Sequence, residues 1–297
     1  MSAPEFAEAA APAKVNLFLR VLAREEGGYH GLETLFCALS LADTVRVARG
    51  APGIRLHVEG AVDTGPPERN LCVRAAERFH AALGEPAAAD IHLTKRIPSA
   101  AGLGGGSSDG AATLRALNAL HGEPLPRAAL LQMAVELGAD VPFFLCGSPL
   151  ALAWGRGERL MPLPPLPPRP VLVAHPGQAM PTADAFAEIA RLRGGVHHPR
   201  SVLIDPADLR SWAGAASIAM NEFEPVVADR ISGVRGGIEA MRSAGERIAL
   251  LAGSGSSVFG IFDTAAERDS AAPAVHALGL RLWRAETLAA TPEPVVR

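Results

Sequence analysis

A glycine-rich stretch, GLGGGSS at residues 102–108, is the part of the sequence that points most directly to chemistry. Glycine adopts positive φ angles at little cost, so such a stretch lets the backbone approach a ligand closely. Ser107, Ser108 and Asp109 are residue types that favour the N-terminus of a helix. There the unpaired N–H groups and the positive end of the helix dipole attract anions. The segment therefore predicts a phosphate-binding loop that leads into a helix.

Two common nucleotide-binding motifs do not fit this loop. No lysine follows the glycines as GxxxxGK[ST] requires, and Ser107 occupies the place of the last glycine in GxGxxG. A dinucleotide-binding oxidoreductase is therefore disfavoured, since the ribose-binding carboxylate of that fold is also missing. A plain turn before a helix is the simplest alternative, but four glycines among residues 102–106 are more than a turn needs.

Asp140 and Lys14 are candidates for acid–base and electrostatic catalysis. Asp140 follows a predicted helix end at Gly138 and precedes Val141-Pro142, which we expect to keep the chain extended and the carboxylate accessible. A carboxylate beside an alcohol either takes its proton or orients it, and a nearby lysine keeps the carboxylate ionised. Lys14 lies on a predicted strand two residues before Asn16, so both side chains point to the same side. The structural alternatives are a loop aspartate bonded to its own backbone and a solvated lysine at a strand end.

Length and composition limit the classes of protein that the chain can be. Its 297 residues suit one large domain or two smaller ones, and 48% hydrophobic residues allow a sizeable core. A net charge of −3 argues against a nucleic-acid partner. Three cysteines without a CxxC pair, no signal-peptide pattern and no long apolar run predict a cytoplasmic protein with no membrane association. The histidines show no metal-ligand spacing, so no metal site is firmly assigned.

Strand and helix signals alternate along the chain, and their order positions the candidate residues. We predict strands at residues 15–22, 54–58, 91–97, 171–174, 248–252 and 258–262. We predict helices at residues 71–83, 109–120, 127–137, 182–192 and 234–244. The first twelve residues are expected to be mobile.

A run of prolines, PLPPLPPRP at residues 162–170, divides the chain. Six prolines within it make it stiff and extended, and they exclude it from the interior of a sheet. It is our candidate boundary between domains at residues 1–164 and 165–297, with a long surface loop inside one domain as the alternative. Both halves mix helices with locally connected strands, which predicts an α+β fold rather than a doubly wound parallel sheet.

The whole pattern PxxxGLGGGSS after a strand resembles the ATP loop of the GHMP kinases, the superfamily of galactokinase, homoserine kinase, mevalonate kinase and phosphomevalonate kinase. Two further segments are similar to its other signatures, APAKVNLFL at residues 11–19 and LAGSGSSVFGIFD at residues 251–263. Residues 13–45, which contain GGYH, and GADVPFFLCG at residues 138–147 resemble one branch of the superfamily, whose acceptor is a cytidyl-diphosphate methylerythritol compound. The resemblance covers most of the chain, with a gap near residues 194–210.

The resemblance implies a ribosomal-S5-like N-terminal domain and a ferredoxin-like C-terminal domain, with the active site in the cleft between them. It implies ATP and Mg²⁺, and phosphorylation of the C2 hydroxyl of the methylerythritol unit in the non-mevalonate isoprenoid precursor pathway. Lys14 and Asp140 would be catalytic, and Ser107 or Ser108 could reach Mg²⁺. The implied nucleotide-binding residues are Lys95, Pro98, Ser99, Ala100, Ala101, Gly102, Leu103, Gly104, Gly105, Gly106, Ser107 and Ser108.

The same resemblance implies a set of side chains that hold the acceptor. These are Asn16, Tyr29, His30, Asp140, Thr182 and Phe186. The aromatic ring and the imidazole in GGYH suit a pyrimidine, although the motif alone also fits a hairpin turn. Phe186 also fits an ordinary core position of a helix. Residues 253–257 would support the cleft or form a tight turn, and Asn221 and Glu224 match a signature without an assigned role.

Two other functions remain open at this point. A homoserine or mevalonate-type kinase has the same ATP loop but no use for pyrimidine contacts. A nucleotide-binding regulator without turnover would not need an acid–base pair such as Lys14 and Asp140, so it is disfavoured. The sequence fits either a monomer or a homodimer that binds small molecules.

Overall fold

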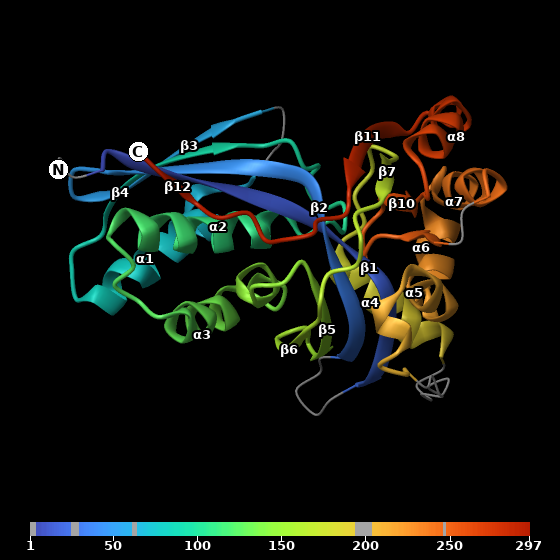
Figure 1. The fold of residues 1–297 in the computed structure, drawn as a ribbon, viewed down its shortest axis with the longest axis horizontal. Coiled ribbons are helices and arrows are strands. Elements are labelled where there is room, and N and C mark those ends of the chain that lie inside the picture. Colours follow the sequence, from blue (N-terminus) through green and yellow to red (C-terminus); the bar gives the residue numbers. More distant parts are fainter. Residues whose placement is uncertain (1–3, 25–29, 61–63, 194–203, 246–247) are drawn as a thin grey trace.

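The computed structural model describes residues 4–24, 30–60, 64–193, 204–245 and 248–297. Within these ranges the chain forms an eight-stranded sheet and a four-stranded sheet, each covered by helices. Figure 1 shows the two sheets as parts of two bodies that lie side by side, with β1 and β2 continuing from the first body toward the second. The predicted α+β class is confirmed.

The first sheet is built on two long antiparallel strands, β1 (Phe6–Arg24) and β2 (His30–Arg49). Its strand order is β12-β1-β2-β4-β3, while β5 and β6 extend it from β2, and β8 pairs with β1. The remaining strands are β3 (Gly53–Glu59), β4 (Ala88–Thr94), β5 (Leu150–Gly155), β6 (Arg159–Pro162), β8 (Met220–Asn221) and β12 (Val295–Val296).

The N-terminal half of β1 contradicts the expectation that the first twelve residues are mobile. Residues 6–12 pair with β2, and Ala7, Ala9 and Ala11 are fully or almost fully buried. Period-2 burial of small side chains fits a strand packed on a helical layer. The register shifts between Pro12 and Lys14, where proline cannot donate to the ladder. The expectation was wrong because alanine carries little strand preference, and the pairing partner lies far along the chain.

Three helices and a 3-10 helix cover one face of this sheet (Figure 1). They are α1 (Leu71–Leu83), α2 (Gly105–Leu120), α3 (Arg127–Leu137) and residues Val141–Leu145. Helix α1 begins and ends as predicted, because the Asn70 side chain accepts from the Cys72 N–H and Gly84 ends the helix in the left-handed conformation. Helix α2 begins four residues before the predicted Asp109, because Gly104 serves as a left-handed N-cap.

The segment after Asp140 also differs from the prediction. We expected Pro142 to keep the chain extended, but Asp140 has φ −86° and ψ −14° and the next residues form the 3-10 helix. Proline is tolerated there because it occupies the first turn, where its missing N–H has no helical partner. The turn buries Phe143 and Phe144 in the first core and leaves the side chain of Asp140 at its N-terminus.

The second sheet has the order β11-β7-β10-β9, and its neighbouring strands are antiparallel. The strands are β7 (Pro170–His175), β9 (Ile248–Leu251), β10 (Val258–Ile261) and β11 (Arg281–Glu286). The helices of this body are α4 (Thr182–Leu192), α5 (Trp212–Ile218), α6 (Glu224–Arg230), α7 (Val234–Ser243) and α8 (Ala265–Ala277). The predicted strand, glycine turn and strand around residues 253–257 are confirmed.

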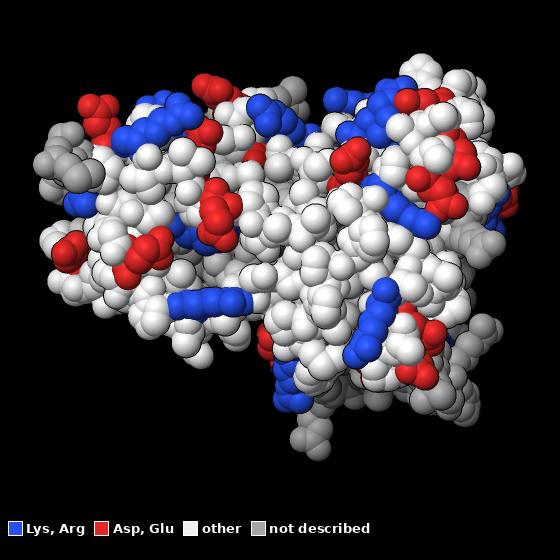
Figure 2. Space-filling view, viewed as in Figure 1, with Lys and Arg blue, Asp and Glu red and all other residues white. Residues whose placement is uncertain are grey.

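The two bodies share strands and core. Leu19 and Val21 of β1 lie in the same apolar cluster as Ala185 and Ile189 of α4. The last strand, β12, returns to β1, so the two chain ends lie close together (Figure 1). Figure 2 shows acidic and basic side chains interspersed on the face in view. Among the described residues, no helix is long and apolar enough to cross a membrane.

Candidate active site

Lys14 lies at the bulge of β1 and is only 4% exposed. Its backbone N–H donates to the carbonyl of Leu103 in the glycine-rich loop at 2.9 Å. Its Nζ donates to Asn16 Oδ1 at 3.0 Å and lies 3.5 Å from Asp140 Oδ2. The structure therefore brings Lys14, Asn16 and Asp140 together, and it excludes the alternative of a solvated strand-end lysine.

A hydrogen-bond chain orients the amide of Asn16. Asn16 Nδ2 donates to Thr34 Oγ1 at 2.7 Å, and Thr34 donates in turn to the Phe18 carbonyl at 2.6 Å. This arrangement turns Asn16 Oδ1 toward Lys14. The Lys14 Nζ also lies 5.3 Å from the ring centroid of Phe36, within range of a cation–π contact. Thr34 and Phe36 were not predicted from the sequence, since they become neighbours of Lys14 only through the pairing of β1 with β2.

Lys14 and Asp140 line a cavity of about 710 Å³ between the two bodies. Thr182 and Phe186 of α4 line its opposite side. Thr182 Oγ1 lies 3.0 Å from Ser254 Oγ, and the Phe186 ring packs edge-on against Phe223 with a centroid distance of 4.9 Å. Phe186 is half-buried, so part of its side chain faces the cavity and the rest packs against the core.

Two predicted acceptor residues lie at the edge of what the structure describes. Tyr29 falls outside the described residues. His30 is the first residue of β2, where its backbone pairs with Arg24. Their predicted contacts with the acceptor therefore stay predictions.

The glycine-rich loop lines a second cavity, of about 370 Å³. The residues that line it include Lys95 and all of residues 98–107, and therefore every predicted nucleotide-binding residue except Ser108. Ser108 is buried behind the loop, in the first turns of α2. Arg69 and Asn70, which precede α1, also line this cavity and were not predicted.

Two glycine-rich segments meet backbone to backbone beside this cavity. A Cβ added to Gly102 would lie 1.8 Å from the Ala252 carbonyl oxygen, and one added to Gly255 would lie 2.2 Å from the Gly102 nitrogen. The Ser257 N–H donates to the Ala101 carbonyl at 3.2 Å. Only glycine permits this approach. Residues 253–257 thus support the glycine-rich loop directly.

Asn221 holds the second of these segments. Its Nδ2 donates to the carbonyls of Leu251 and Gly253 at 2.7 and 2.8 Å, and its Oδ1 accepts from the Phe223 N–H at 2.9 Å. Glu224 lies nearby, where its carboxylate accepts from the Leu251 N–H at 3.3 Å. Asn221 and Glu224, which matched a family signature without an assigned role, therefore both hold the segment around Leu251 and Gly253.

Lys14 lines the larger cavity and packs against Gly104, which lines the glycine-loop cavity. A Cβ added to Gly104 would lie 2.9 Å from Lys14 Cγ, and one added to Gly253 would lie 3.2 Å from Lys14 Nζ. The ammonium group is therefore enclosed by both glycine segments on one side and faces Asp140 on the other. A cation that lines one cavity and packs against a glycine of the other is suited to stabilise negative charge that moves between them.

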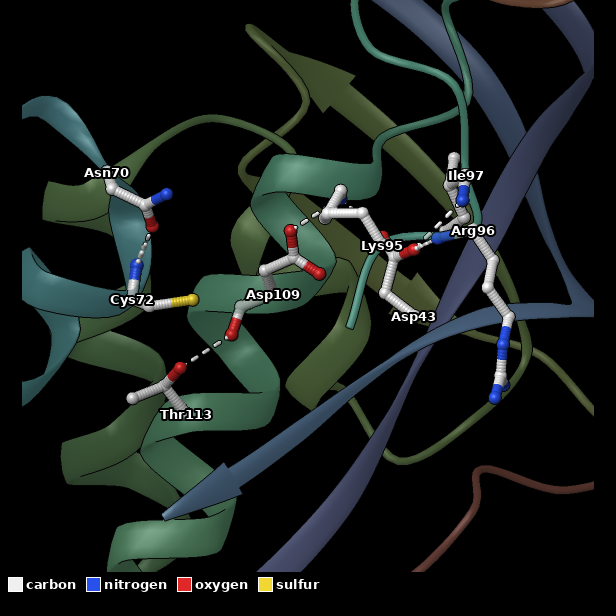
Figure 3. Close-up of polar contacts among 8 residues, drawn as sticks. All are labelled: Asp43, Asn70, Cys72, Lys95, Arg96, Ile97, Asp109 and Thr113. Carbon is white, nitrogen blue, oxygen red and sulfur yellow. Dashed lines mark hydrogen bonds and ion pairs between the residues drawn. The ribbon is translucent and has the colours of Figure 1, made fainter. Parts of the chain in front are cut away.

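A buried ion triad underlies the loop (Figure 3). Lys95 Nζ lies 2.7 Å from Asp109 Oδ2 and also pairs with Asp43. The other oxygen of Asp43 accepts from the backbone N–H groups of Arg96 and Ile97. Asp43 was missed from the sequence because β2 brings it to the loop from 52 positions away. The triad fixes the chain as it enters the glycine-rich loop.

The triad carries two carboxylates for one ammonium. The pKa of Asp109 is raised to about 7, mainly because the carboxyl is buried; Lys95 opposes this shift and the neighbouring Asp43 adds to it. Burial lowers the pKa of Lys95, but Asp109 and Asp43 together raise it above its ordinary value. Cys72 of α1 lies alongside, and burial raises the pKa of its thiol, so it stays protonated (Figure 3).

The buried polar atoms beside the loop suit a phosphate and its counter-ion. Ser108 Oγ and Asp109 Oδ1 are buried without a hydrogen-bond partner among the described residues. Buried polar groups are rarely left unpaired, so such atoms indicate a binding function. Hydroxyl and carboxylate oxygens are the ligands that Mg²⁺ prefers, and the loop supplies backbone N–H groups for phosphate.

Comparison with known proteins agrees with this geometry. Residues 70–148 match the family described as GHMP kinases N terminal domain. The 4-diphosphocytidyl-2-C-methyl-D-erythritol kinase of Paraburkholderia phytofirmans is 41% identical, over 88% of this chain and 87% of the relative. The enzyme of the same name from Deinococcus radiodurans is 40% identical, over 89% of this chain and 87% of the relative.

Solved structures show the same likeness. The crystal structure of a 4-(cytidine 5'-diphospho)-2C-methyl-D-erythritol kinase superposes with a TM-score of 0.78 at 39% identity, covering 94% of this chain and 98% of that one. The homoserine kinase from Cytophaga hutchinsonii superposes with a TM-score of 0.74 at 21% identity, covering 100% of this chain and 99% of that one. The second likeness shows the shared fold alone.

Replacement of Gly102 by alanine should destabilise the protein. Its φ of +80° costs a side chain roughly 1–2 kcal/mol, and the added Cβ would force one of the two glycine segments to move. We expect the free energy of unfolding in urea to fall by at least about 1 kcal/mol. Gly106→Ala is the matched control, because its Cβ would meet nothing within 4 Å, and alanine is the better helix residue. An equal loss in both variants would contradict the proposed contact.

Replacement of Asp109 by asparagine should change how stability depends on pH. Because the pKa of Asp109 is raised to about 7, the folded state holds a proton between about pH 4 and 7 that the unfolded chain has released. The wild type should therefore lose stability relative to Asp109→Asn as pH rises through this window, by at most about 1.4 kcal/mol per pH unit. Urea unfolding of both proteins at a series of pH values measures the difference, and parallel curves would show that Asp109 is not shifted.

Proposed function

Because the chain belongs to the family of 4-diphosphocytidyl-2-C-methyl-D-erythritol kinases within the GHMP kinases, we propose that it phosphorylates the C2 hydroxyl of 4-diphosphocytidyl-2-C-methyl-D-erythritol. The products are the 2-phosphate and ADP, in the non-mevalonate (methylerythritol phosphate) route to isoprenoid precursors. The observation that carries the proposal is the Lys14–Asp140 pair, which lines the larger acceptor cavity while Lys14 packs against Gly104 of the glycine-lined cavity.

Asp140 is the proposed catalytic carboxylate. Its side chain is 32% exposed and lines the acceptor cavity, so an acceptor hydroxyl can reach it. It accepts or orients the proton of that hydroxyl while the oxygen attacks the γ-phosphorus. The ion pair with Lys14 holds this carboxylate in place beside the ammonium group.

Lys14 is the proposed electrostatic catalyst. Its ammonium is held by Asn16 and Asp140 and enclosed by both glycine segments, so it needs little reorganisation when charge develops on the transferred group. Preorganised charge of this kind is the main contribution that a protein makes to phosphoryl transfer. Asn16 orients Lys14 and lines the acceptor cavity, where it can also bind the acceptor.

ATP is the phosphate donor, and we propose that its phosphates lie against the glycine-rich loop. The backbone from Pro98 to Gly106 and the N-terminus of α2 provide the N–H groups that cradle phosphate. Mg²⁺ bound there would neutralise phosphate charge, and Ser107, Ser108 and Asp109 carry the oxygens to hold it.

The acceptor cavity is proposed to hold the cytidyl-diphosphate moiety between the two bodies. Thr182 and Phe186 provide a hydroxyl and a ring from α4, and Tyr29 and His30 are predicted to contact the base from the β1–β2 connection. We further propose a boundary between domains at residues 164 and 165, and a cytoplasmic location. The protein would act as a monomer or homodimer on small molecules.

Turnover with a panel of acceptors tests the proposed function. Purified protein with ATP and Mg²⁺ should phosphorylate 4-diphosphocytidyl-2-C-methyl-D-erythritol and not homoserine, mevalonate or galactose. Asp140→Asn should lower kcat by roughly 10²–10⁴-fold, because it removes the proton acceptor while keeping the shape of the side chain. Unfolding by urea should show that the variant is folded.

The outcomes of this panel are distinct. Turnover of homoserine or mevalonate in place of the cytidyl compound would keep the ATP loop and overturn the acceptor assignment. ATP binding without turnover of any acceptor would favour a regulator. Full activity of Asp140→Asn would remove Asp140 from the chemistry.

Replacement of Phe186 by alanine should separate acceptor binding from ATP binding. Loss of the ring removes apolar surface from the acceptor cavity, so we expect the KM for the cytidyl acceptor to rise roughly ten-fold or more. The KM for ATP should stay within about two-fold, because Phe186 does not line the glycine-loop cavity. Phe186→Leu is the control for bulk, and an equal rise in both KM values would indicate a merely structural role.

A further inference from the structure

Two histidines and a glutamate from separate parts of the first body come together at the far ends of α1 and α2. They are His80 near the end of α1, Glu85 just after it and His121 at the C-cap of α2. One ligand atom of each lies within 4.8 Å of the others. Imidazole nitrogen and carboxylate oxygen are common ligands of Zn²⁺, at about 2.0–2.2 Å from the metal.

The surroundings of the His80 side chain indicate that it binds a ligand. It is only 2% exposed, and both of its ring nitrogens are buried without a hydrogen-bond partner among the described residues. Its ring packs edge-on against Phe79 and His121, which satisfies neither nitrogen. A buried polar group left unpaired typically costs about 1–3 kcal/mol, so a neutral core histidine is a poor account of this position.

Backbone contacts position both His121 and Glu85. His121 Nδ1 donates to the Leu117 carbonyl at 2.9 Å, which fixes the tautomer and leaves Nε2 as the ligand atom. A backbone carbonyl behind the imidazole is the usual support for a metal-binding histidine. Glu85 is placed by Gly84, which turns the chain in the left-handed conformation so that the Glu85 N–H donates to the His80 carbonyl at 3.1 Å.

We propose that His80, Glu85 and His121 form a binding site for one divalent transition-metal ion, with Zn²⁺ as the preferred ion and water at the fourth position. Glu85 is exposed and His121 half-buried, so the ion enters from solvent and reaches His80 last.

The site would join the distal ends of the two helices whose N-termini line the glycine-loop cavity. Helices of 13 and 16 residues are about 20–24 Å long, so the ion would be remote from the reacting phosphate. The metal would therefore stabilise the packing of α1 on α2 and take no part in the reaction. Mg²⁺ would not replace it, because imidazole is a poor ligand for that ion.

Metal binding by the whole chain tests the proposal. Protein purified without a histidine tag and treated with EDTA should bind one equivalent of Zn²⁺ in calorimetry, and Zn²⁺ should raise its Tm. Co²⁺ in place of Zn²⁺ should give the visible absorption bands of a four-coordinate site. Glu85→Gln and His121→Ala should each weaken Zn²⁺ binding at least about ten-fold.

The controls separate this site from adventitious binding and from the kinase site. His276→Ala removes an exposed histidine of α8 and should bind Zn²⁺ like the wild type. Glu85→Gln should retain kinase turnover, so loss of metal binding and loss of the proposed activity are distinguishable. No saturable Zn²⁺ binding, or equal binding by wild type and His121→Ala, would overturn the proposal.

Discussion

Gly102 and Gly255 bring the backbones of two loops into direct contact, and the active-site geometry depends on this contact. One loop belongs to the first body and enters α2, while the other connects β9 to β10 in the second. No side chain can stand between them, since an added Cβ at either position would overlap backbone atoms. Because Lys14 is enclosed by both segments, its position depends on the alignment of the two bodies. A change at the contact therefore reaches Lys14, the proposed catalytic lysine, without a change in its own strand.

Lys95 and Lys14 are both buried, but they differ in the number of their carboxylate partners. This difference distinguishes the structural role of Lys95 from the catalytic role proposed for Lys14. Lys95 has two carboxylate partners that are themselves almost fully buried, so its charge is balanced within the fold. Lys14 has one carboxylate partner that is a third exposed, together with the amide oxygen of Asn16. Its charge is therefore available to a phosphate that arrives between the two cavities. Removal of Lys95 would leave two buried carboxylates without a cation, which is typically far more costly than loss of a surface pair.

The sequence predicted some of the elements whose signals are local, but not α8, although a capping box of Thr264 and Glu267 begins it. Asn70 and Gly84 bracket α1 because both end signals lie in the helix's own sequence, and α4 covers Thr182–Leu192, although Pro181 and not Thr182 holds its N-cap position. The features it did not predict depend on long-range pairing. Thr34 and Asp43 acquire their roles only when β2 pairs with β1 and β4, and His80 meets His121 only when α1 packs on α2. We predicted that α2 starts at Asp109 because glycine is a poor helix former. In the structure the helix starts at Gly105.

The same fold serves acceptors of different size, and the structure shows where that difference must arise. A homoserine kinase superposes over the whole chain at 21% identity, so the shared fold does not by itself select the acceptor. Helix α4 forms a part of the cavity wall that lies outside the Gly102–Gly255 contact. Helix α4 presents Thr182 and Phe186 to the cavity, and Phe186 rests on Phe223 in the adjacent segment. Substitutions on α4 can reshape the acceptor cavity while Lys14, Asn16 and Asp140 keep their positions, because those three are held by β1, β2 and the 3-10 helix. With the roles proposed for these residues, specificity and chemistry are carried by different elements of the fold.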